Sequence, residues 1–276
     1  MPEDNLLKEL ERQRDEIARQ KKEIIYSLQY ASLIQSALLP EEQMMKMYLP
    51  DHFVIYLPKD IISGDFYWMA EANDCVLFAA ADCTGHGVPG ALMSILGISF
   101  LNEVLQEKCH LKANRILNQL REKIMKALHQ TGEEAKSKDG MDNALCIYNS
   151  RSGELQYSGA NNPLYLIRDK ALEEIRPDKM PIGISGIEEL SFTNHLLQIK
   201  KGDIIYLFSD GFADQFGGPE GKKFKYKPFK QLLLEIHKKP LSEQKDILVS
   251  AIYDWTGDLD QVDDILIMGV RFQNIK

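Results

Sequence analysis

The chain has 276 residues, of which 44% are hydrophobic and 27% are charged, and its formal net charge is −8 at pH 7. This length and balance are typical of a globular protein with one large domain, or with one domain and an appendage, that buries a sizeable core. The negative net charge argues against a nucleic-acid-binding protein, whose surface carries a basic patch or stripe.

The cysteines are scattered and contain no CxxC pair, so their spacing matches neither a zinc site nor a disulfide framework. They are Cys75, Cys83, Cys109 and Cys146. We expect reduced thiols in a cytoplasmic protein. The N-terminus is charged from Glu3 to Glu23, unlike a signal peptide. No apolar stretch is expected to approach the ~18 residues of a membrane span, and no direct membrane insertion is predicted.

Residues 3–38 contain no glycine or proline and are rich in good helix formers, which predicts one long helix that ends before Pro40. One column of residues recurs at intervals of seven, as in a coiled-coil heptad: Leu10, Ile17, Ile24, Ala31 and Leu38. The companion column, at 6, 13, 20, 27 and 34, is polar through its middle. We therefore predict weak homodimerisation through this helix, with a solvated single helix as the alternative. Its apolar second half, from residue 26, is expected to pack on the following domain.

Beyond Pro50 the sequence changes to short apolar runs broken by Gly, Pro and Asp, which is typical of strands. The runs are HFVIYL, DCVLFAAA, ALCIYN, LQYSGA, PLYLIR, DIIYLFS and DILIMGVRF. Helices are expected over 88–108 and 113–131 and near 228–255. Strands grouped around a central helical pair, with more helix near the end, indicate an α+β fold of packed sheet and helix layers.

Four segments share one design, an aspartate with small neighbours at the end or the start of an apolar strand. These aspartates are Asp65, Asp82, Asp210 and Asp263. A strand end holds a carboxylate rigidly, and an adjacent Gly or Ala lets metal and substrate approach. One such aspartate is an ordinary turn residue, but four of them predict a site for hard divalent cations, which prefer oxygen ligands. Asp264 either joins Asp263 in this site or caps a turn.

Five motifs follow one another in the order GDFYWM (64–69), ADCTGHGVPGALMS (81–94), SGANNPLYLIR (158–168), LFSDGFAD (207–214) and VDDILIMGVRF (262–272). Together they resemble the metal-dependent protein phosphatase family (PPM, or PP2C-like), in its bacterial SpoIIE/RsbU-like branch, over roughly residues 50–272. IQSALLP (34–40) resembles the linker helix before such domains. The resemblance implies a four-layer αββα sandwich over residues 41–276, preceded by a helical or coiled-coil linker over residues 1–40.

The resemblance also implies a centre of two divalent cations, Mn²⁺ or Mg²⁺. Its ligands would be Asp65, Asp82, Asp210, Asp263 and the main-chain carbonyl of Cys83, with Asp82 bridging the ions. Two metals imply that a hydroxide held between them attacks phosphorus in line while the ions offset phosphoryl charge. We see no GxSxG or Cys–His arrangement that indicates a side-chain nucleophile.

The sequence departs from the family in how it would hold phosphate. Eukaryotic members carry an early phosphate-gripping arginine, but no arginine lies between Arg19 and Arg115 here. Lys59 is the candidate substrate-binding cation, with an ordinary loop charge as the alternative. The segment that matches the family's Gly-Asp-Ser-Arg motif reads Gly-Ala-Asn-Asn at 159–162, which argues against a third metal. His86 is a candidate general acid or water-orienting residue, with a structural turn role as the alternative.

Three further segments favour structural roles. Asp142 is predicted to form a turn before the strand ALCIYN, with a place in the cleft as the alternative. Asn161 and Asn162 are predicted to form a turn before Pro163. The basic run Lys222–Lys227 is predicted to be a solvated loop rather than a nucleic-acid strip, and a docking surface for an acidic protein is the other interpretation.

The resemblance implies a bacterial signal-transduction enzyme, a protein serine/threonine phosphatase. By resemblance its substrate is a phosphorylated regulatory protein, an anti-anti-sigma, STAS-like partner. The N-terminal helix is expected to regulate it by homodimerising, and an upstream sensor domain is compatible with this arrangement. The alternatives are a catalytically inactive scaffold that binds phosphoproteins and a two-metal phosphohydrolase of small molecules.

Overall fold

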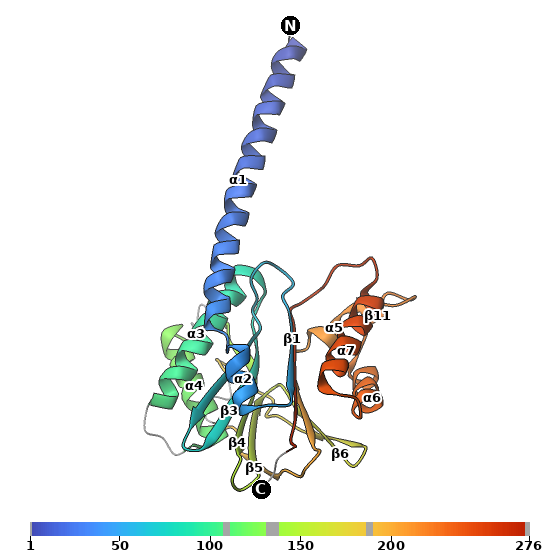
Figure 1. Cartoon of the computed structure of the whole chain (residues 1–276). Helices are drawn as coiled ribbons and strands as arrows, with labels where there is room; N and C mark the ends of the chain where they lie inside the picture. Colours follow the sequence, from blue (N-terminus) through green and yellow to red (C-terminus); the bar gives the residue numbers. More distant parts are fainter. Residues whose placement is uncertain (1, 107–110, 131–137, 186–189, 274–276) are drawn as a thin grey trace.

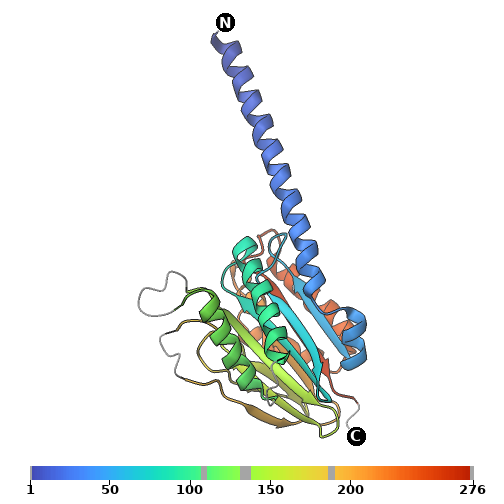
Figure 2. The same ribbon diagram turned by 90° about the vertical axis from the view of Figure 1, so that its left-hand side faces the viewer.

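The computed structural model describes residues 2–106, 111–130, 138–185 and 190–273 (Figure 1). Its first element is the helix α1 (Pro2–Leu38), whose N-terminal half projects from the body of the molecule (Figures 1 and 2). The predicted long helix is therefore confirmed, and it ends before Pro40, which cannot continue it. A short helix that the sequence analysis missed, α2 (Glu42–Tyr48), follows and buries Met45.

Two five-stranded antiparallel sheets form the body. The first has the order β1 (His52–Leu57), β12 (Ile265–Arg271), β9 (Ile204–Phe208), β6 (Leu164–Arg168) and β7 (Ala171–Ile175). The second has the order β2 (Phe66–Ala72), β3 (Cys75–Cys83), β4 (Met141–Asn149), β5 (Glu154–Ala160) and β8 (His195–Gln198). A two-stranded ribbon joins β10 (Phe216–Gly217) to β11 (Lys222–Lys223).

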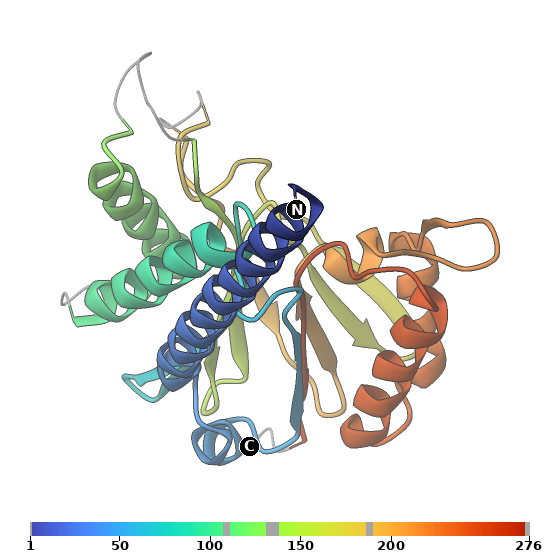
Figure 3. The ribbon, with the colours of Figure 1, turned by 90° about the horizontal axis from the view of Figure 1, so that it is seen from above.

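Helices cover the outer face of each sheet, as Figure 3 shows from above. The second sheet carries α3 (Gly87–Gln106) and α4 (Ala113–Ala127), and the first carries α6 (Tyr226–Ile236) and α7 (Leu241–Thr256), with the short α5 (Gly211–Asp214) after β9. One buried apolar cluster lies between the two sheets and one lies under each helical layer. The predicted four-layer αββα sandwich is confirmed.

Some elements differ from the prediction for local reasons. The stretch predicted near 228–255 is two helices, because Pro240 precedes α7 and cannot donate a backbone hydrogen bond to the turn before it. β2 was missed because its aromatic run was read only as a motif. β8 was missed because its four residues pair along one edge, with β5 alone. The thiols of Cys75, Cys83 and Cys146 are free, and Cys109 lies outside the described residues.

The helix α3 shows that the expectation of no apolar stretch near the length of a membrane span was wrong. Within the described residues it is the one helix of sufficient length and apolarity to cross a membrane, with 20 residues and a mean hydropathy of 1.6 in its most apolar window. In this fold it packs on the second sheet and on α4, and it buries Met93, Ile98, Leu101 and Val104. Its composition is accounted for by that core position.

Candidate metal centre

The two sheets bring the four predicted aspartates to one edge of the sandwich. Asp65 directly precedes β2, and Asp82 is the next-to-last residue of β3. Asp210 follows β9, and Asp263 lies just before β12. Because β3 contacts both β9 and β12 across the sandwich, strand ends far apart in sequence meet at this edge.

Asp65 is the most deeply buried of the four, with 2% of its surface exposed. Its Oδ2 is buried and has no hydrogen-bond partner. Burial and the negative charge of Asp82 hold its pKa well above the usual range, against a lowering hydrogen bond from Ser209. Asp65 is therefore a buried carboxylate that needs a proton or a cation.

Asp82 and Asp210 show the same electrostatic signature. Burial, followed by the charges of Asp210 and Asp142, raises the pKa of Asp82 well above its ordinary value, although a backbone N–H of Asp210 donates to its carboxylate. Burial, followed by the charges of Asp214 and Asp263, raises the pKa of Asp210 to about 6. These mutual shifts show that the carboxylates face a common space.

The structure separates the roles of Asp263 and Asp264. Asp264 is buried and accepts the backbone N–H of Lys59 on Oδ1 (2.8 Å) and that of Gly64 on Oδ2 (2.7 Å). It is therefore committed to joining two loops. Asp263 accepts only the adjacent N–H of Asp264 on Oδ1 (2.9 Å), and its charge raises the pKa of Asp65, Asp82 and Asp210. Both carboxylates act on the pKa of Asp65, but Asp264 uses both oxygens on main-chain N–H groups, so Asp263 is the one of the pair left available for a cation.

The backbone around Asp65 is packed too closely for side chains. A Cβ on Gly64 would lie 2.5 Å from the carbonyl oxygen of Gly85 and 3.3 Å from that of Cys83. The Cys83 carbonyl therefore lies beside the Gly64–Asp65 peptide. Burial, followed by the charge of Asp82, raises the pKa of the Cys83 thiol well above its usual value, so its main-chain oxygen is the atom suited to a cation.

Lys59 and His86 meet at the exposed mouth of this edge. The Nζ of Lys59 lies 3.0 Å from Nε2 of His86, and Nδ1 of His86 lies 2.8 Å from Oδ2 of Asp60. An ammonium only donates, so Nε2 accepts from Lys59 and Nδ1 donates to Asp60. In this arrangement His86 positions Lys59 and has no proton on Nε2 to give.

Asp142 corrects the prediction of a turn. It lies inside β4 and is the direct cross-strand partner of Asp82 in β3. Burial raises its pKa, and Nδ2 of Asn161 donates to its Oδ1 (2.8 Å). Asn161 has a φ of 56°, as expected for the predicted turn before Pro163. Asp142 is thus a further carboxylate of the centre, and only its pairing with Asp82 reveals it.

The basic run is also partly misassigned. Lys222 and Lys223 form β11 rather than a loop, and Tyr226 begins α6. Nζ of Lys223 pairs with Oδ2 of Asp214 (2.7 Å), which places this cation near Asp210. The run is therefore divided between a ribbon and a helix.

Among the described His, Cys, Asp and Glu residues, no three side chains already converge as a metal-ligand group. The donor set nevertheless fits hard cations: it consists of carboxylates and one carbonyl, it includes the orphaned Oδ2 of Asp65, and its members repel one another. Ions that bind here would draw together carboxylates that stand apart without them.

Comparisons with known proteins agree with this architecture. Residues 72–273 match the family model of stage II sporulation protein E (SpoIIE), so the match begins after Asp65 and includes the other three aspartates. The phosphoserine phosphatase RsbU of Bacillus subtilis (strain 168) is 24% identical over 246 residues, which is 84% of this chain and 65% of RsbU. The chain thus spans slightly less than two thirds of that relative.

Two solved structures show the same fold. The SiaA-PP2C domain of Pseudomonas aeruginosa superposes with a TM-score of 0.83 at 32% identity, covering 92% of this chain and 98% of that domain. RsbX, solved in complex with magnesium, superposes with a TM-score of 0.55 at 16% identity, covering 80% of this chain and 94% of RsbX. These neighbours show that the αββα sandwich of this chain is the PP2C-like fold.

Proposed function

This chain belongs to the SpoIIE branch of the PPM protein phosphatases, and on that premise we propose that it hydrolyses phosphoserine or phosphothreonine on a regulatory protein. The observation that carries the proposal is the buried acidic cluster, in which Oδ2 of Asp65 lacks any hydrogen-bond partner. Buried carboxylates without cationic neighbours need protons or cations. At neutral pH a pair of divalent cations meets that need.

We propose that Asp65, Asp82, Asp210 and Asp263 hold two divalent cations, Mn²⁺ or Mg²⁺, with Asp82 between them and the Cys83 carbonyl as a further ligand. The magnesium complex of the RsbX neighbour supports this choice of ion. Bound there, such cations supply an acidified water and positive charge for the phosphoryl oxygens. Asp264 holds the loops of Lys59 and Gly64 in place around them.

Lys59 is the proposed phosphate grip. Its backbone is fixed by Asp264, and its ammonium lies at the exposed mouth beside His86. An ammonium there would meet a phosphoryl group that reaches the cluster and offset its charge. His86 and Asp60 then act as positioning residues, and His86 acts as a general acid only when Nε2 carries a proton.

The proposed substrate is a small phosphorylated regulatory protein, of the anti-anti-sigma, STAS-like kind, in the cytoplasm. The relative RsbU, named a phosphoserine phosphatase, supports the phosphoserine specificity. Purified chain with Mn²⁺ should release phosphate from a phosphoserine protein, and EDTA should stop the release. Binding of the phosphoprotein without release would favour an inactive scaffold instead. Faster release from nucleotides than from protein would favour a small-molecule phosphohydrolase.

The long helix reaches the acidic centre through one buried side chain. Gln35 of α1 donates from Nε2 to the carbonyl of Ser63 (2.6 Å) and to Oγ of Ser94 on α3 (2.8 Å). Its Oε1 accepts the backbone N–H of Ser63 (3.1 Å). Ser63 directly precedes the Gly64–Asp65 pair. A rotation or shift of α1 therefore acts on the loop that holds Asp65.

Along the projecting part of α1, beyond the body of the molecule, an apolar column is left uncovered. Its exposed members include Leu6, Leu10, Ile17, Ile24, Ile34 and Leu38. We propose that residues 1–40 pair with a second copy and regulate a phosphatase domain of residues 41–276, with an upstream sensor as the source of the signal. Pairing would bury this column, and its geometry would bias Gln35 and thereby metal binding.

Deleting residues 1–25 should convert a dimer into a monomer, and Gln35→Ala should change activity without changing the oligomeric state. The reason is that the deletion removes most of the column, whereas Gln35 touches the Asp65 loop. We expect Gln35→Ala to lower activity at limiting Mn²⁺ by about 10–100-fold, as for residues that orient metal ligands. Light scattering and Mn²⁺ titration measure the two effects.

Gln29→Ala is the matched control, because Gln29 lies on the exposed side of the same helix. It should leave both properties unchanged. If the deletion alters neither oligomeric state nor activity, the proposed regulation by this helix is wrong.

A further inference from the structure

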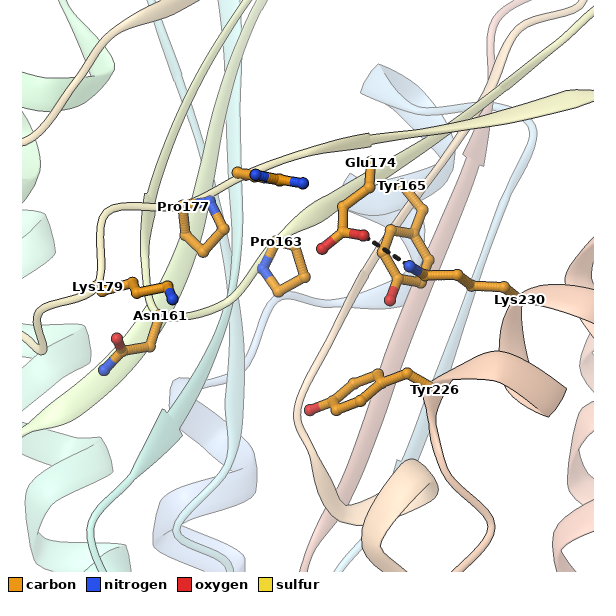
Figure 4. Close-up of a pocket in the computed structure, with 9 residues that line it drawn as sticks. Asn161, Pro163, Tyr165, Glu174, Pro177, Lys179, Tyr226 and Lys230 are labelled. Atoms are coloured by element: carbon orange, nitrogen blue, oxygen red, sulfur yellow. Dashed lines mark hydrogen bonds and ion pairs between the residues drawn. The ribbon is translucent and has the colours of Figure 1, made fainter.

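A pocket of about 570 Å³ lies between the edge of the first sheet and α6. We call it the Tyr226 pocket. Figure 4 shows Asn161 and Lys179 on one side of it and Tyr226 and Lys230 on the other, with Tyr165 set back beside Lys230. None of these residues belongs to the acidic centre, and none has been given a role in hydrolysis.

The Tyr226 pocket adjoins the acidic centre on two sides. On one side Asn161 donates to Asp142, which is the cross-strand partner of Asp82. On the other side the phenol of Tyr226 lies close enough to Asp210 and Asp214 for their charges to raise its pKa, after the larger effect of burial. When the phosphate of a substrate enters the acidic centre, the residues that flank the phosphorylated side chain therefore lie against this pocket.

The charge of the pocket is opposite to that of the centre. Nζ of Lys230 pairs with Oε2 of Glu174 (2.6 Å) and lies over the ring of Tyr165. The charge of Lys230 is therefore balanced by Glu174. Arg176 and Lys179 are exposed, and within the described part of the chain their side chains form no ion pair or hydrogen bond. Two available cations thus lie beside a cluster of carboxylates.

These two cations are held on a fixed segment. The backbone N–H of Asp178 donates to the carbonyl of Gly159 (3.0 Å), and the N–H of Asn161 donates to the carbonyl of Asp178 (2.9 Å). The Asp178 carboxylate accepts the backbone N–H and the hydroxyl of Thr193 (2.7 and 2.9 Å), so its hydrogen bonds hold the Thr193 segment. The segment around Asp178 is preorganised with its positive charges outward.

We propose that the Tyr226 pocket docks acidic side chains that flank the phosphorylated residue of the substrate protein, with Arg176 and Lys179 as their partners. This inference rests on the proposed phosphatase function. The occupant is a protein segment because the proposed function brings a phosphorylated protein to the adjacent acidic centre, and two exposed cations match a short acidic stretch beside its phosphorylated residue. Tyr165 and Tyr226 offer apolar surface to the stems of the bound side chains.

The test compares two phosphoserine peptides, one with aspartates beside the phosphoserine and one with asparagines at the same positions. The wild type should turn over the acidic peptide with the higher kcat/KM, and added salt should reduce the difference. The double variant Arg176→Glu, Lys179→Glu should lose about 10-fold in kcat/KM on the acidic peptide, through KM. Its turnover of p-nitrophenyl phosphate should be unchanged.

Arg115→Glu, Lys201→Glu is the matched control, since it makes the same charge change at exposed positions on α4 and after β8. It should keep the wild-type preference. Equal turnover of both peptides by the wild type overturns the docking role and leaves the phosphatase function standing. A double variant that also loses p-nitrophenyl phosphate turnover overturns it too, because the residues would then act on the centre itself. A wild type without Mn²⁺-dependent turnover of any phosphate ester contradicts the proposed function instead.

Discussion

Asp82→Asn should lower phosphoprotein turnover by at least about 10²–10³-fold, the loss that follows removal of a major electrostatic stabiliser. Asp82 interacts electrostatically with Asp65, Asp210 and Asp263, and burial is the largest cause of its raised pKa. Asparagine keeps the shape and still accepts the backbone N–H of Asp210, but it carries no charge to hold two cations. Release of phosphate at saturating Mn²⁺ measures the effect.

The same variant should make the metal-free protein more stable. Its buried charge is disfavoured both by burial and by the neighbouring carboxylates, and the substitution removes that cost. A Tm that rises in EDTA while activity vanishes identifies a functional carboxylate rather than a structural one. Asp254→Asn is the control on the exposed side of α7 and should change neither quantity. Retained turnover in Asp82→Asn would contradict the proposed centre.

The sequence correctly predicted the features that depend on residues close together in the chain. The N-terminal helix follows from helix-forming residues up to Pro40, and most strands follow from apolar runs between breakers. All four aspartates were predicted at an end of an apolar strand, three after one and Asp263 before one, and the structure places all four at one edge, although Asp65 precedes β2 instead of following a strand. Such features need only the neighbouring residues to be interpreted.

The sequence did not predict the roles that depend on contacts between residues far apart in the chain. Asp263 and Asp264 are the same residue type side by side, and only the N–H groups of Lys59 and Gly64, some 200 residues away in the chain, show that Asp264 is structural. Asp142 lies in a Gly- and Asn-containing segment that is typical of turns, and only strand pairing places it opposite Asp82. Neither the hydrogen bonds of Asp264 nor the strand pairing of Asp142 can be recognised from the residues next to them in the sequence.

Without metal, the chain should lose thermal stability as the pH rises from about 4 through about 6. The pKa of Asp210 is raised from 3.8 to about 6 in the folded state, by burial first and then by the charges of Asp214, Asp263 and Asp142. The folded state therefore keeps a proton that the unfolded state has already released, so the unfolding free energy falls with rising pH. This one group contributes about 2–3 kcal/mol.

Other groups with shifted pKa values either extend this loss of stability or oppose it only at the acidic end of the range. Asp65 and Asp82, whose pKa values are raised well above the ordinary value, continue the loss toward higher pH. Glu9 and Glu16, whose pKa values are lowered by neighbouring arginines, and Glu42, whose pKa is lowered against the effect of burial by Lys46 and His52, act in the opposite direction near and below their ordinary value of 4.5, at exposed positions. Tm in EDTA across this range should thus decline, with a shallower slope in Asp210→Asn than in Asp254→Asn.

Mn²⁺ should reverse the loss, because a cation can replace the missing protons. A site that binds with the metal at about 100 times its Kd stabilises the fold by about 2.7 kcal/mol. Because protons compete for the same carboxylates, the rise in Tm on adding Mn²⁺ should be large at pH 7.5 and small at pH 5. An equal rise at both pH values, or an undiminished rise in Asp82→Asn, would place the bound metal elsewhere. The pH dependence thus tests the acidic centre by binding alone, even where no substrate protein is known.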